Sequence, residues 1–444
     1  MKNIKLTFWI LMILLTGLWL LVGSFPPETI SFFSLRDGLV QYTGIMAIGA
    51  MSVAMILAAR PRPVEAPLHG LDKMYRLHKW LGIGGLAFAI IHWFWAKGAK
   101  WMVGWGWLER PERHKQAAVD TLGAVEQFFR SQRALAESAG EWAFYAAILL
   151  IAIALISRIP YHHFVKPHKL LAAVYLVLVA HSVVLMKFDY WTQPVGIVMG
   201  LLMAGGTVGA VMSLFGLIGA GRKVKGRIEA LTYYPELRVL ETSIKLEDGW
   251  AGHEAGQFAF VTSDRREGAH PYTIASSWEG DGHITFITKA LGDHTSRLYD
   301  RLKLGDAVKV EGPYGCFNFV DQNQRQIWIG AGIGITPFIA RLKELAHIPG
   351  EKVIDLFHTT ADYEEKAIRK LKADAEAANV TLHVLVDRKD GQLNTDRIKE
   401  AVPAWEGASI WFCGPAGFGQ ALRKGFLASG INPSDFHQEL FHLR

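Results

Sequence analysis

Apolar residues crowd the first 220 positions of this 444-residue chain and form six long stretches there. Each stretch reaches, or nearly reaches, the ~20 residues that a helix needs to cross a bilayer. The pattern predicts a six-helix transmembrane bundle over 1–220, with the first stretch retained as a span because it is long for a signal peptide. The expected spans are roughly 6–23, 38–58, 77–96, 141–157, 168–187 and 194–219.

The pattern changes to short alternating strands near Gly226 and changes again near Arg325. Strands separated by Gly, Asp and Pro turns predict an antiparallel β-barrel over 224–322. Beyond it, strands alternate with helices, which predicts a parallel sheet in a Rossmann-like α/β nucleotide domain over 323–444. The expected fold class is a multi-domain membrane protein that joins this bundle, barrel and α/β domain.

Basic residues gather in four short segments between or after the expected spans. By the positive-inside rule, the side that holds these segments is cytoplasmic. Both termini and everything after residue 224 are then expected in the cytoplasm, with 97–140 as an external loop of a multi-pass cell-membrane protein. The segments are 59–63, 73–76, 157–169 and 221–227.

Composition excludes two other classes of protein. The net charge of +6 is explained by these membrane-flanking segments, and no run resembles a basic helix that binds nucleic acid. Only two cysteines, Cys316 and Cys413, are present. No disulfide framework is therefore expected, which agrees with a reducing compartment.

Two expected spans each carry a histidine near both ends. His78 and His92 are fourteen residues apart, which sets them ~21 Å apart along a helix and within ~40° of one face. His168 and His181 are thirteen residues apart, a similar rise but ~140° of offset, so their helix must be distorted for both rings to face one neighbour.

This arrangement predicts two stacked metal centres, because imidazole is a common axial ligand of haem iron and is costly in lipid without a partner. His78 with His168 is expected to hold an inner haem, and His92 with His181 an outer one. The alternatives are packed interfacial histidines, or His162 and His163 as the inner ligands. The small residues Gly82, Gly84 and Gly85 would let a flat macrocycle approach the backbone.

The segment "HPYTIASS" (270–277) follows a strand and a turn. It resembles the flavin motif of the ferredoxin-reductase superfamily, and more closely that of its membrane branch, the ferric reductases and NADPH oxidases. The resemblance implies that His270, Pro271, Tyr272 and Thr273 contact FAD, with Thr273 near the redox-active nitrogen of the flavin. An ordinary strand that contains a tyrosine is the alternative.

The segment "ITKALGDHTSRL" (287–298) ends a strand, turns at Gly292 and begins a helix. Backbone amides and the Thr295 hydroxyl at a helix N-terminus suit a pyrophosphate, and Lys289 adds positive charge. The resemblance assigns this segment to the FAD diphosphate. It also identifies "EGPYG" (311–315) as a family signature that closes the barrel.

The segment "GAGIGITPF" (330–338) joins a strand to a helix. Gly330, Gly332 and Gly334 allow a tight turn and close approach of the backbone to a phosphate, and Thr336 with Pro337 opens the helix. Such a loop alone is a weak signal. With "FCGPAGF" (412–418) later in the chain it predicts a site for NADPH or NADH.

The resemblance places Cys413, Gly414 and Pro415 beside the nicotinamide, where a plain core cysteine is the alternative. It also matches Phe441, with Glu439, to an aromatic residue that covers the flavin; a frayed terminal strand is the alternative. The coenzyme is harder to predict. The stretch "HTTADYEE" lacks the arginine typical of NADP-binding relatives, and Arg388 with Lys389 only slightly favours NADPH.

The implied activity is transmembrane electron transfer from cytosolic NAD(P)H through FAD and two b-type haems to an outside acceptor. Oxygen, giving superoxide, is preferred over a ferric chelate, because no chelate-binding signature is seen. A haem-free flavin reductase anchored in the membrane is the rival. No calcium-binding loop or regulatory insertion is seen, so activity without an obligate regulatory subunit is expected.

Three arginines near the expected span ends are candidates for contact with the haems. Arg36 is expected to hold a propionate, to attract a small anion such as superoxide, or to act as an interfacial anchor. Arg76 and Arg158 are candidates for the propionates of the inner haem.

Overall fold

A computed structural model describes residues 2–23, 25–109, 123–156, 161–264 and 266–439, with the backbone alone for 2–3 and 161–166. The chain divides into two compact units, one of residues 1–68 and 73–218 and one of residues 69–72 and 219–443. The second unit contains both β-sheets without dividing between them, so the boundaries 224–322 and 323–444 stay predictions.

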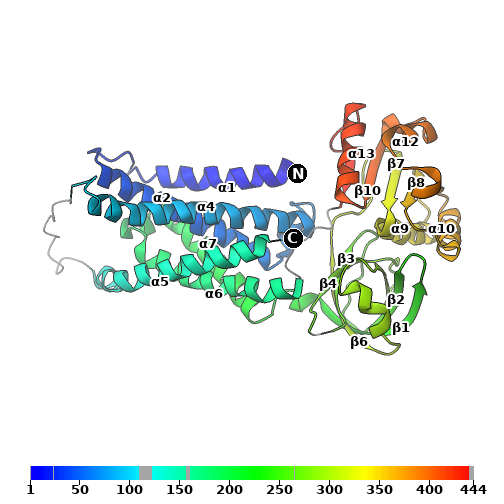
Figure 1. Cartoon of the computed structure of the whole chain (residues 1–444), viewed down its shortest axis with the longest axis horizontal. Helices are drawn as coiled ribbons and strands as arrows, with labels where there is room; N and C mark the ends of the chain where they lie inside the picture. The colour runs from blue at the N-terminus through cyan, green and yellow to red at the C-terminus, as the bar shows by residue number, and fades with distance from the viewer. Residues whose placement is uncertain (1, 24, 110–122, 157–160, 265, 440–444) are drawn as a thin grey trace. The chain divides into compact units, whose positions relative to one another are not determined.

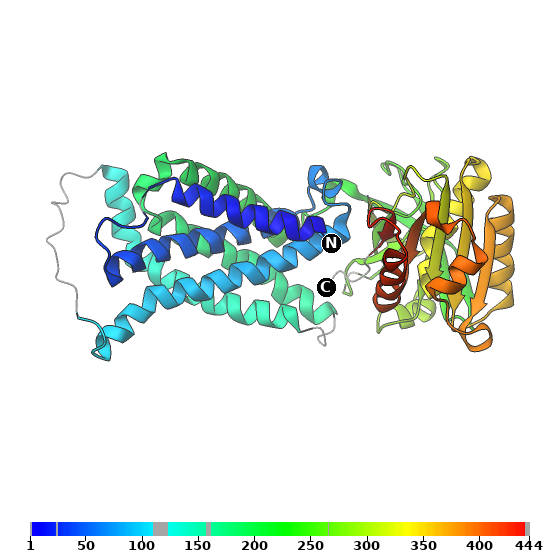
Figure 2. The ribbon, with the colours of Figure 1, turned by 90° about the horizontal axis from the view of Figure 1, so that it is seen from above.

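Long helices lie side by side in the first unit (Figures 1 and 2). Within the described residues, five of them, α2 and α4–α7, are long and apolar enough to cross a membrane. The apolar part of α1, Ile4–Leu20, is shorter than the ~20 residues that a crossing needs. Five of the six predicted spans therefore coincide with helices that could cross a membrane, and the count of six is not confirmed. The helices are α1 (Lys2–Leu20), α2 (Phe32–Ala58), the short α3 (Arg62–Glu65), α4 (Leu71–Gly104), α5 (Ala124–Leu155), α6 (Tyr161–Leu185), the 3₁₀ helix η2 (Phe188–Thr192) and α7 (Pro194–Leu214).

The segment 97–140, expected as an external loop, is helical at both ends. Helix α4 continues to Gly104, and α5 begins at Ala124. The polar start of α5 carries ion pairs one turn apart, Arg130 with Glu126 at 2.8 Å and Arg133 with Glu137 at 3.0 Å. Such pairs stabilise a helix without an apolar face. A search for apolar stretches therefore could not find this extension.

Local chemistry fixes the starts of two spans. Ser31 caps α2: its hydroxyl accepts from the Ser34 amide, and the Ser34 hydroxyl accepts from the Ser31 amide. Two otherwise unsatisfied amides of the first turn are thereby bonded. Helix α7 begins at Pro194, where the missing N–H costs nothing because that amide has no helical partner.

The first sheet of the second unit has six antiparallel strands in the order β4-β3-β6-β1-β2-β5. Burial alternates along β5 and the start of β1, so one face packs on an apolar core that includes Ile228, Ile284 and Val310. The ladder is not closed into the predicted barrel. Its edge strands meet through one isolated bridge, Ile274 with Phe286. The strands are β1 (Lys223–Tyr234), β2 (Val239–Leu246), β3 (Phe258–Thr262), β4 (His270–Thr273), β5 (His283–Lys289) and β6 (Ala307–Tyr314).

The second sheet has five parallel strands in the order β11-β10-β7-β8-β9, as the alternating pattern predicts. Strands β7, β8 and β10 are buried almost throughout, because helices cover both faces. Phe338 and Leu371 pack on one face, Ile398 and Phe426 on the other. The strands are β7 (Arg325–Ala331), β8 (Val353–Thr360), β9 (Thr381–Val386), β10 (Ala408–Cys413) and β11 (Phe436–Gln438).

The remaining elements connect these strands. They are η3 (Ala220–Arg222), η4 (Thr295–Arg297), α8 (Leu298–Arg301), η5 (Gly332–Ile335), α9 (Thr336–His347), α10 (Glu365–Ala377), α11 (Asp387–Asp390), α12 (Thr395–Ala401), η6 (Trp405–Gly407) and α13 (Ala416–Ala428). The chain runs outward from β7 to β9 and then returns to the other side of β7 as β10. In open parallel sheets, ligands bind at the carboxyl ends of the strands where the strand order reverses in this way.

Candidate functional site

Four histidines of the first unit form two facing pairs. The rings of His78 (α4) and His168 (α6) have centroids 5.9 Å apart, with 70° between their planes. The rings of His92 and His181, on the same two helices, are 6.2 Å apart at 84°. Two imidazoles that bind one ion from opposite sides have centroids about 6 Å apart, because a metal–imidazole bond is ~2 Å. Both predicted pairs therefore lie together at a spacing that suits a shared metal ion.

Helix carbonyls orient three of these four rings. A carbonyl oxygen only accepts, so the nearby Nδ1 carries the proton and Nε2 keeps the lone pair that binds a metal. The three Nδ1 contacts are 2.8 Å from His78 to the Ala54 oxygen, 3.0 Å from His92 to the Val40 oxygen and 2.8 Å from His181 to the Ala136 oxygen.

Two glycines outside α4 make room for the outer pair. Gly140 of α5 lies against His181, and a β-carbon there would overlap the imidazole ring. Gly44 of α2 lies against His92, where a β-carbon would stand 3.3 Å from the ring. The sequence analysis missed both residues, because the contact that requires a glycine joins two different helices.

The three glycines of α4 differ from one another. Gly84 packs on Phe8, and Gly85 packs on Met51 with the backbone of Ala47, so these two let α4 approach α1 and α2 rather than a macrocycle. Gly82 has open space where a side chain would begin, and for it the prediction of close approach stands.

Both histidines of α6 face α4 despite their thirteen-residue spacing. Pro167 lies inside α6, directly before His168. A proline removes one helical hydrogen bond and displaces the carbonyl of the preceding turn, which distorts the helix locally. This distortion lies before His168, so it affects the place of the inner histidine in the bundle and not the spacing between His168 and His181. The rival ligands His162 and His163 have side chains outside the described residues.

Arg36 links α2 to α4 about one turn beyond His92. Its Nε and Nη2 donate to the carbonyl oxygens of Trp95 and Ala96, both at 3.1 Å, and its Nη1 pairs with Asp37 at 2.9 Å. These contacts support the anchoring role among the three expected for Arg36. Arg76 has an exposed side chain, and Arg158 lies outside the described residues.

A cleft of about 890 Å³ in the second unit gathers most of the predicted flavin and nucleotide residues. It lies where β7, β8, β9 and β10 end and where β4 and β5 of the other sheet approach. The predicted residues that line it are Pro271, Tyr272, Thr273, Lys289, Thr295, Gly332, Gly334, Thr336, Gly414, Pro415 and Glu439. Those absent from its lining are His270, Gly292, Gly330, Pro337 and Cys413.

Tyr272 presents an unused polar group at this cleft. Its hydroxyl is buried and has no hydrogen-bond partner among the described residues. Burial raises the pKa of Tyr272, so the hydroxyl stays protonated at neutral pH. A buried polar atom without a partner costs about 1–3 kcal/mol, which a bound ligand would recover. Tyr272 and its buried neighbour Thr273 therefore suit a polar heterocycle such as a flavin.

The expected phosphate turn is built by Thr295. Its Oγ1 accepts from the amides of Leu291 and Gly292, both at 3.1 Å, and so holds the turn before η4. Gly292 contributes to the turn through this hydrogen bond and does not line the cleft. Lys289 pairs with Asp362 at 2.9 Å, which holds the cation at the cleft rim.

The three glycines of the nucleotide loop have separate roles. Gly330 and Gly334 let neighbouring backbone segments pack closely. A β-carbon at Gly330 would overlap the backbone of Ile335, and one at Gly334 would overlap that of Cys413. Gly332 has φ 56° and open space at its missing side chain, so its backbone is bare toward the cleft. The Thr336 hydroxyl donates to the Ile333 carbonyl at 2.8 Å, and buried Pro337 starts α9.

Cys413 is fully buried behind the cleft at the end of β10. Burial, with a further contribution from the Glu439 carboxylate, raises the pKa of the Cys413 thiol. A thiol held neutral in this way is a poor nucleophile. Glu439 itself is buried, lines the cleft and follows β11, which pairs with β10. Phe441 lies outside the described residues.

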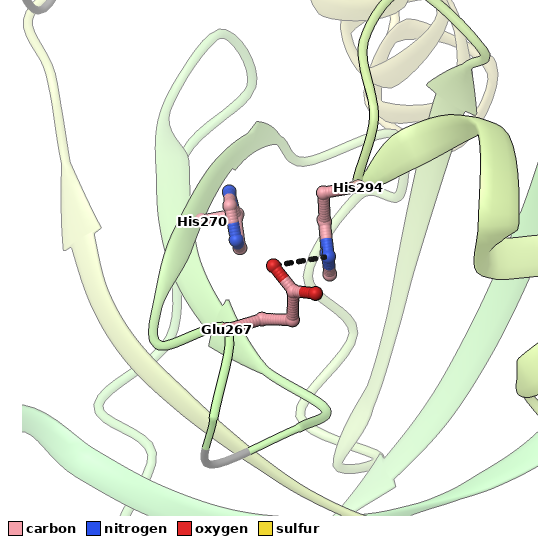
Figure 3. A group of neighbouring side chains, drawn as sticks. All are labelled: Glu267, His270 and His294. Carbon is pink, nitrogen blue, oxygen red and sulfur yellow. Dashed lines mark ion pairs between the residues drawn. The ribbon is translucent and has the colours of Figure 1, made fainter. Parts of the chain in front are cut away.

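His270 lies in a cluster beside the cleft. Its ring stacks on His294 with centroids 3.8 Å apart and 7° between the planes, and the Glu267 carboxylate points toward both rings (Figure 3). Burial and the neighbouring His294 lower the pKa of His270 to about 4, and burial lowers the pKa of His294. Both rings are neutral at neutral pH. A direct contact of His270 with a flavin stays a prediction.

The cleft also contains residues that the sequence analysis missed. Thr359 and Thr360 lie at the end of β8, and Asp387 follows β9. The Thr359 hydroxyl donates to the Asp387 carboxylate at 2.7 Å. These residues could have been predicted from their position at the carboxyl ends of parallel strands, because ligands bind at that edge of such a sheet.

Comparison with known families agrees with this division of sites. Residues 43–179 match the ferric reductase like transmembrane component, a range that contains His78, His92 and His168 and stops just before His181. Residues 234–319 match the oxidoreductase FAD-binding domain, which includes the motif at 270–273 and the turn at Thr295.

Curated relatives match up to half of the sequence. The toluate 1,2-dioxygenase electron transfer component of Pseudomonas putida is 29% identical over 195 residues, which cover 42% of this chain and 58% of that protein. The NADPH oxidoreductase of Mycobacterium tuberculosis is 27% identical over 238 residues, or 50% and 61%. Together with six further curated relatives, these matches span between 37% and 61% of each relative's own length.

Among solved structures, the FAD/NAD-binding domain of nitric oxide dioxygenase from Vibrio cholerae is similar with a TM-score of 0.42 and 21% identity, over 50% of this chain and 98% of that one. The family matches cover both parts of the molecule. The chain therefore joins a ferric-reductase-like transmembrane component to a ferredoxin-reductase-like FAD-binding domain, an arrangement that matches the family of ferric reductases and NADPH oxidases.

Proposed function

We propose that this protein transfers electrons across the cell membrane, from cytosolic NAD(P)H through FAD and two bis-histidine haems to an outside acceptor. The acceptor we favour is oxygen. The balanced reaction is then one NAD(P)H and two O₂ giving NAD(P)⁺, one proton and two superoxide ions. Both termini and the second unit would lie in the cytoplasm, as the basic segments between the spans indicate.

The observation that carries this proposal is the pair of histidine pairs on α4 and α6. Each pair has the ring separation of two imidazoles on one ion, and three rings are held in the tautomer that leaves Nε2 free to bind. Haem iron bound by two imidazoles would supply a one-electron carrier. His78 with His168, and His92 with His181, would hold the two groups.

In the second unit, the cleft residues would bind and orient the flavin and the coenzyme. Tyr272 and Thr273 contact the flavin, and the turn held by Thr295 receives its diphosphate. The bare backbone of Gly332 receives the coenzyme diphosphate at the start of α9. Gly414 and Pro415 form the wall beside the nicotinamide and exclude water there, and the neutral Cys413 lies buried behind them.

One spectrum tests the haem assignment against the rival, a haem-free membrane-anchored flavin reductase. The purified, haem-replete protein should show a Soret band that shifts when NADPH or NADH is added. The His92→Ala variant should lose about half of this absorbance and all transmembrane transfer, while its flavin is still reduced. His347→Ala is the matched control, because His347 is an exposed residue of the second unit. A protein without a Soret band would exclude the two-haem proposal.

A second assay separates the acceptors. If oxygen is the acceptor, reduction of external cytochrome c by protein in vesicles should be abolished by superoxide dismutase. If a ferric chelate is the acceptor, ferrozine should detect ferrous iron at a rate that superoxide dismutase leaves unchanged. The second result would replace the oxygen proposal and leave the electron path intact.

A further inference from the structure

Beside the cleft, two imidazoles and one carboxylate come together from three positions of the second unit. His270 begins β4, Glu267 precedes it in the same loop, and His294 lies in the turn before η4. One ligand atom from each residue lies within 4.8 Å of the other two, and all three side chains are half-buried. Figure 3 shows the Glu267 carboxylate pointing between the two rings, with Oε2 at 3.9 Å from Nδ1 of His294.

We propose that Glu267, His270 and His294 form a binding site for a divalent transition-metal ion of the zinc class. Two histidines and one carboxylate are a ligand set that zinc uses, with water completing the coordination. Zinc bonds of ~2.0–2.2 Å place tetrahedral ligand atoms roughly 3.5 Å apart, so the cluster must close by about 1–1.5 Å. Parallel rings do not aim their lone pairs at one point, so one imidazole must rotate out of the stack.

Oε2 of Glu267 faces His294, and a positive charge lies beside the other carboxylate oxygen. Arg301 approaches the other carboxylate oxygen, Oε1, at 3.5 Å and also Asp264 at 3.8 Å. The positive charge of Arg301 therefore opposes a cation bound at Oε2.

The ion would join two segments that border the cleft. His270 precedes Pro271, and His294 precedes Thr295, and both following residues line the cleft. A metal ion on both histidines therefore fixes β4 to the turn before η4. Metal binding should slow the release of a molecule held between them, which we assign to FAD.

Equilibrium dialysis tests the site. The full-length protein, without a histidine tag and stripped with chelator, is dialysed against micromolar ZnCl₂, and bound zinc is counted by mass spectrometry. We expect one zinc per chain that is lost in His294→Gln and in Glu267→Gln. The control is His347→Gln, which breaks an exposed histidine–carboxylate pair with Glu279 and should keep the zinc. Equal zinc in all four proteins would overturn the proposal.

The Arg301→Gln variant adds a test in the opposite direction. Removing the guanidinium should tighten zinc binding severalfold, because a cation close to the ligands is lost, whereas general damage to the fold would weaken it. Zinc should also slow the appearance of free-FAD fluorescence in the unmodified protein but not in His294→Gln. Weaker zinc binding in Arg301→Gln, or zinc-independent FAD release in the unmodified protein, would contradict the site.

Discussion

Gly140 of α5 lies directly against the imidazole of His181 on α6, so closely that a β-carbon at this position would overlap the ring. The same ring is held by the Ala136 carbonyl, one turn earlier on α5. Helix α5, which carries no histidine of either pair, therefore sets the position of one outer histidine. This relationship makes Gly140 a sensitive position for the proposed outer haem.

Replacing Gly140 by Ala should displace His181 and remove the outer haem. We expect the Soret absorbance per protein to fall by about half, since the inner pair is untouched. Pyridine haemochrome analysis of the purified variant measures this. Gly17→Ala is the control, because Gly17 is an exposed helical glycine with open space around it. Equal loss in both variants would mean that any change to a helical glycine disturbs the bundle.

Replacing Pro167 by Ala should affect the inner pair instead. The alanine restores a helical N–H directly before His168 and lets the first turn of α6 become regular, which shifts His168 relative to His78. We expect loss of the inner haem, or a shifted reduction potential for it, in a redox titration followed by absorbance. Pro194→Ala is the matched control, since a proline in the first turn of α7 replaces no helical bond. An unchanged titration in Pro167→Ala would show that Pro167 does not position His168.

Cys413 should resist alkylation in the folded protein. Its pKa is raised by burial, so the thiol stays neutral, and its side chain is fully buried. Iodoacetamide at pH 8 should modify only Cys316 in the native protein and both cysteines after denaturation, as intact mass measures. Rapid native labelling of Cys413 would contradict this.

The same shift gives a pH dependence of stability. The unfolded thiol ionises near ~8.5, whereas the folded thiol ionises at higher pH. The stabilisation is therefore complete below about pH 8.5 and is lost as the pH rises above it. Between pH 8 and 10, the midpoint temperature of thermal unfolding should fall less steeply for Cys413→Ala than for the unmodified protein.

Replacing Asp387 by Asn should improve the use of NADPH. The carboxylate lies at the end of the cleft opposite the Cys-Gly-Pro segment, where it would repel a 2′-phosphate, and the amide oxygen still accepts from Thr359. We expect the KM for NADPH to fall roughly threefold to tenfold, about 0.7–1.4 kcal/mol, with little change for NADH. Asp396→Asn, at an exposed position of α12, is the control. An equal change for both coenzymes would place Asp387 away from the 2′-position.

Much of the architecture follows from local patterns in the sequence. Apolar stretches predict the spans, and a change in periodicity predicts two sheets of different kinds. The spacing of the four histidines predicts which rings pair, because residues far apart along one helix lie at different depths. The flavin motif is identified by its resemblance to a known family, and the two glycine-containing loops are predicted because glycine permits their tight turns.

The tertiary structure decided what depends on contacts between distant segments. Gly140 matters only because α5 packs against His181, and His270 meets His294 only because the turn before η4 lies beside β4. Asp387 enters the cleft because β9 ends at the same edge of the sheet as β7. The identity and spacing of residues predict the helix or strand that they form. Which neighbour it touches is set by the packing of the whole unit, where close contacts between different elements are determined together.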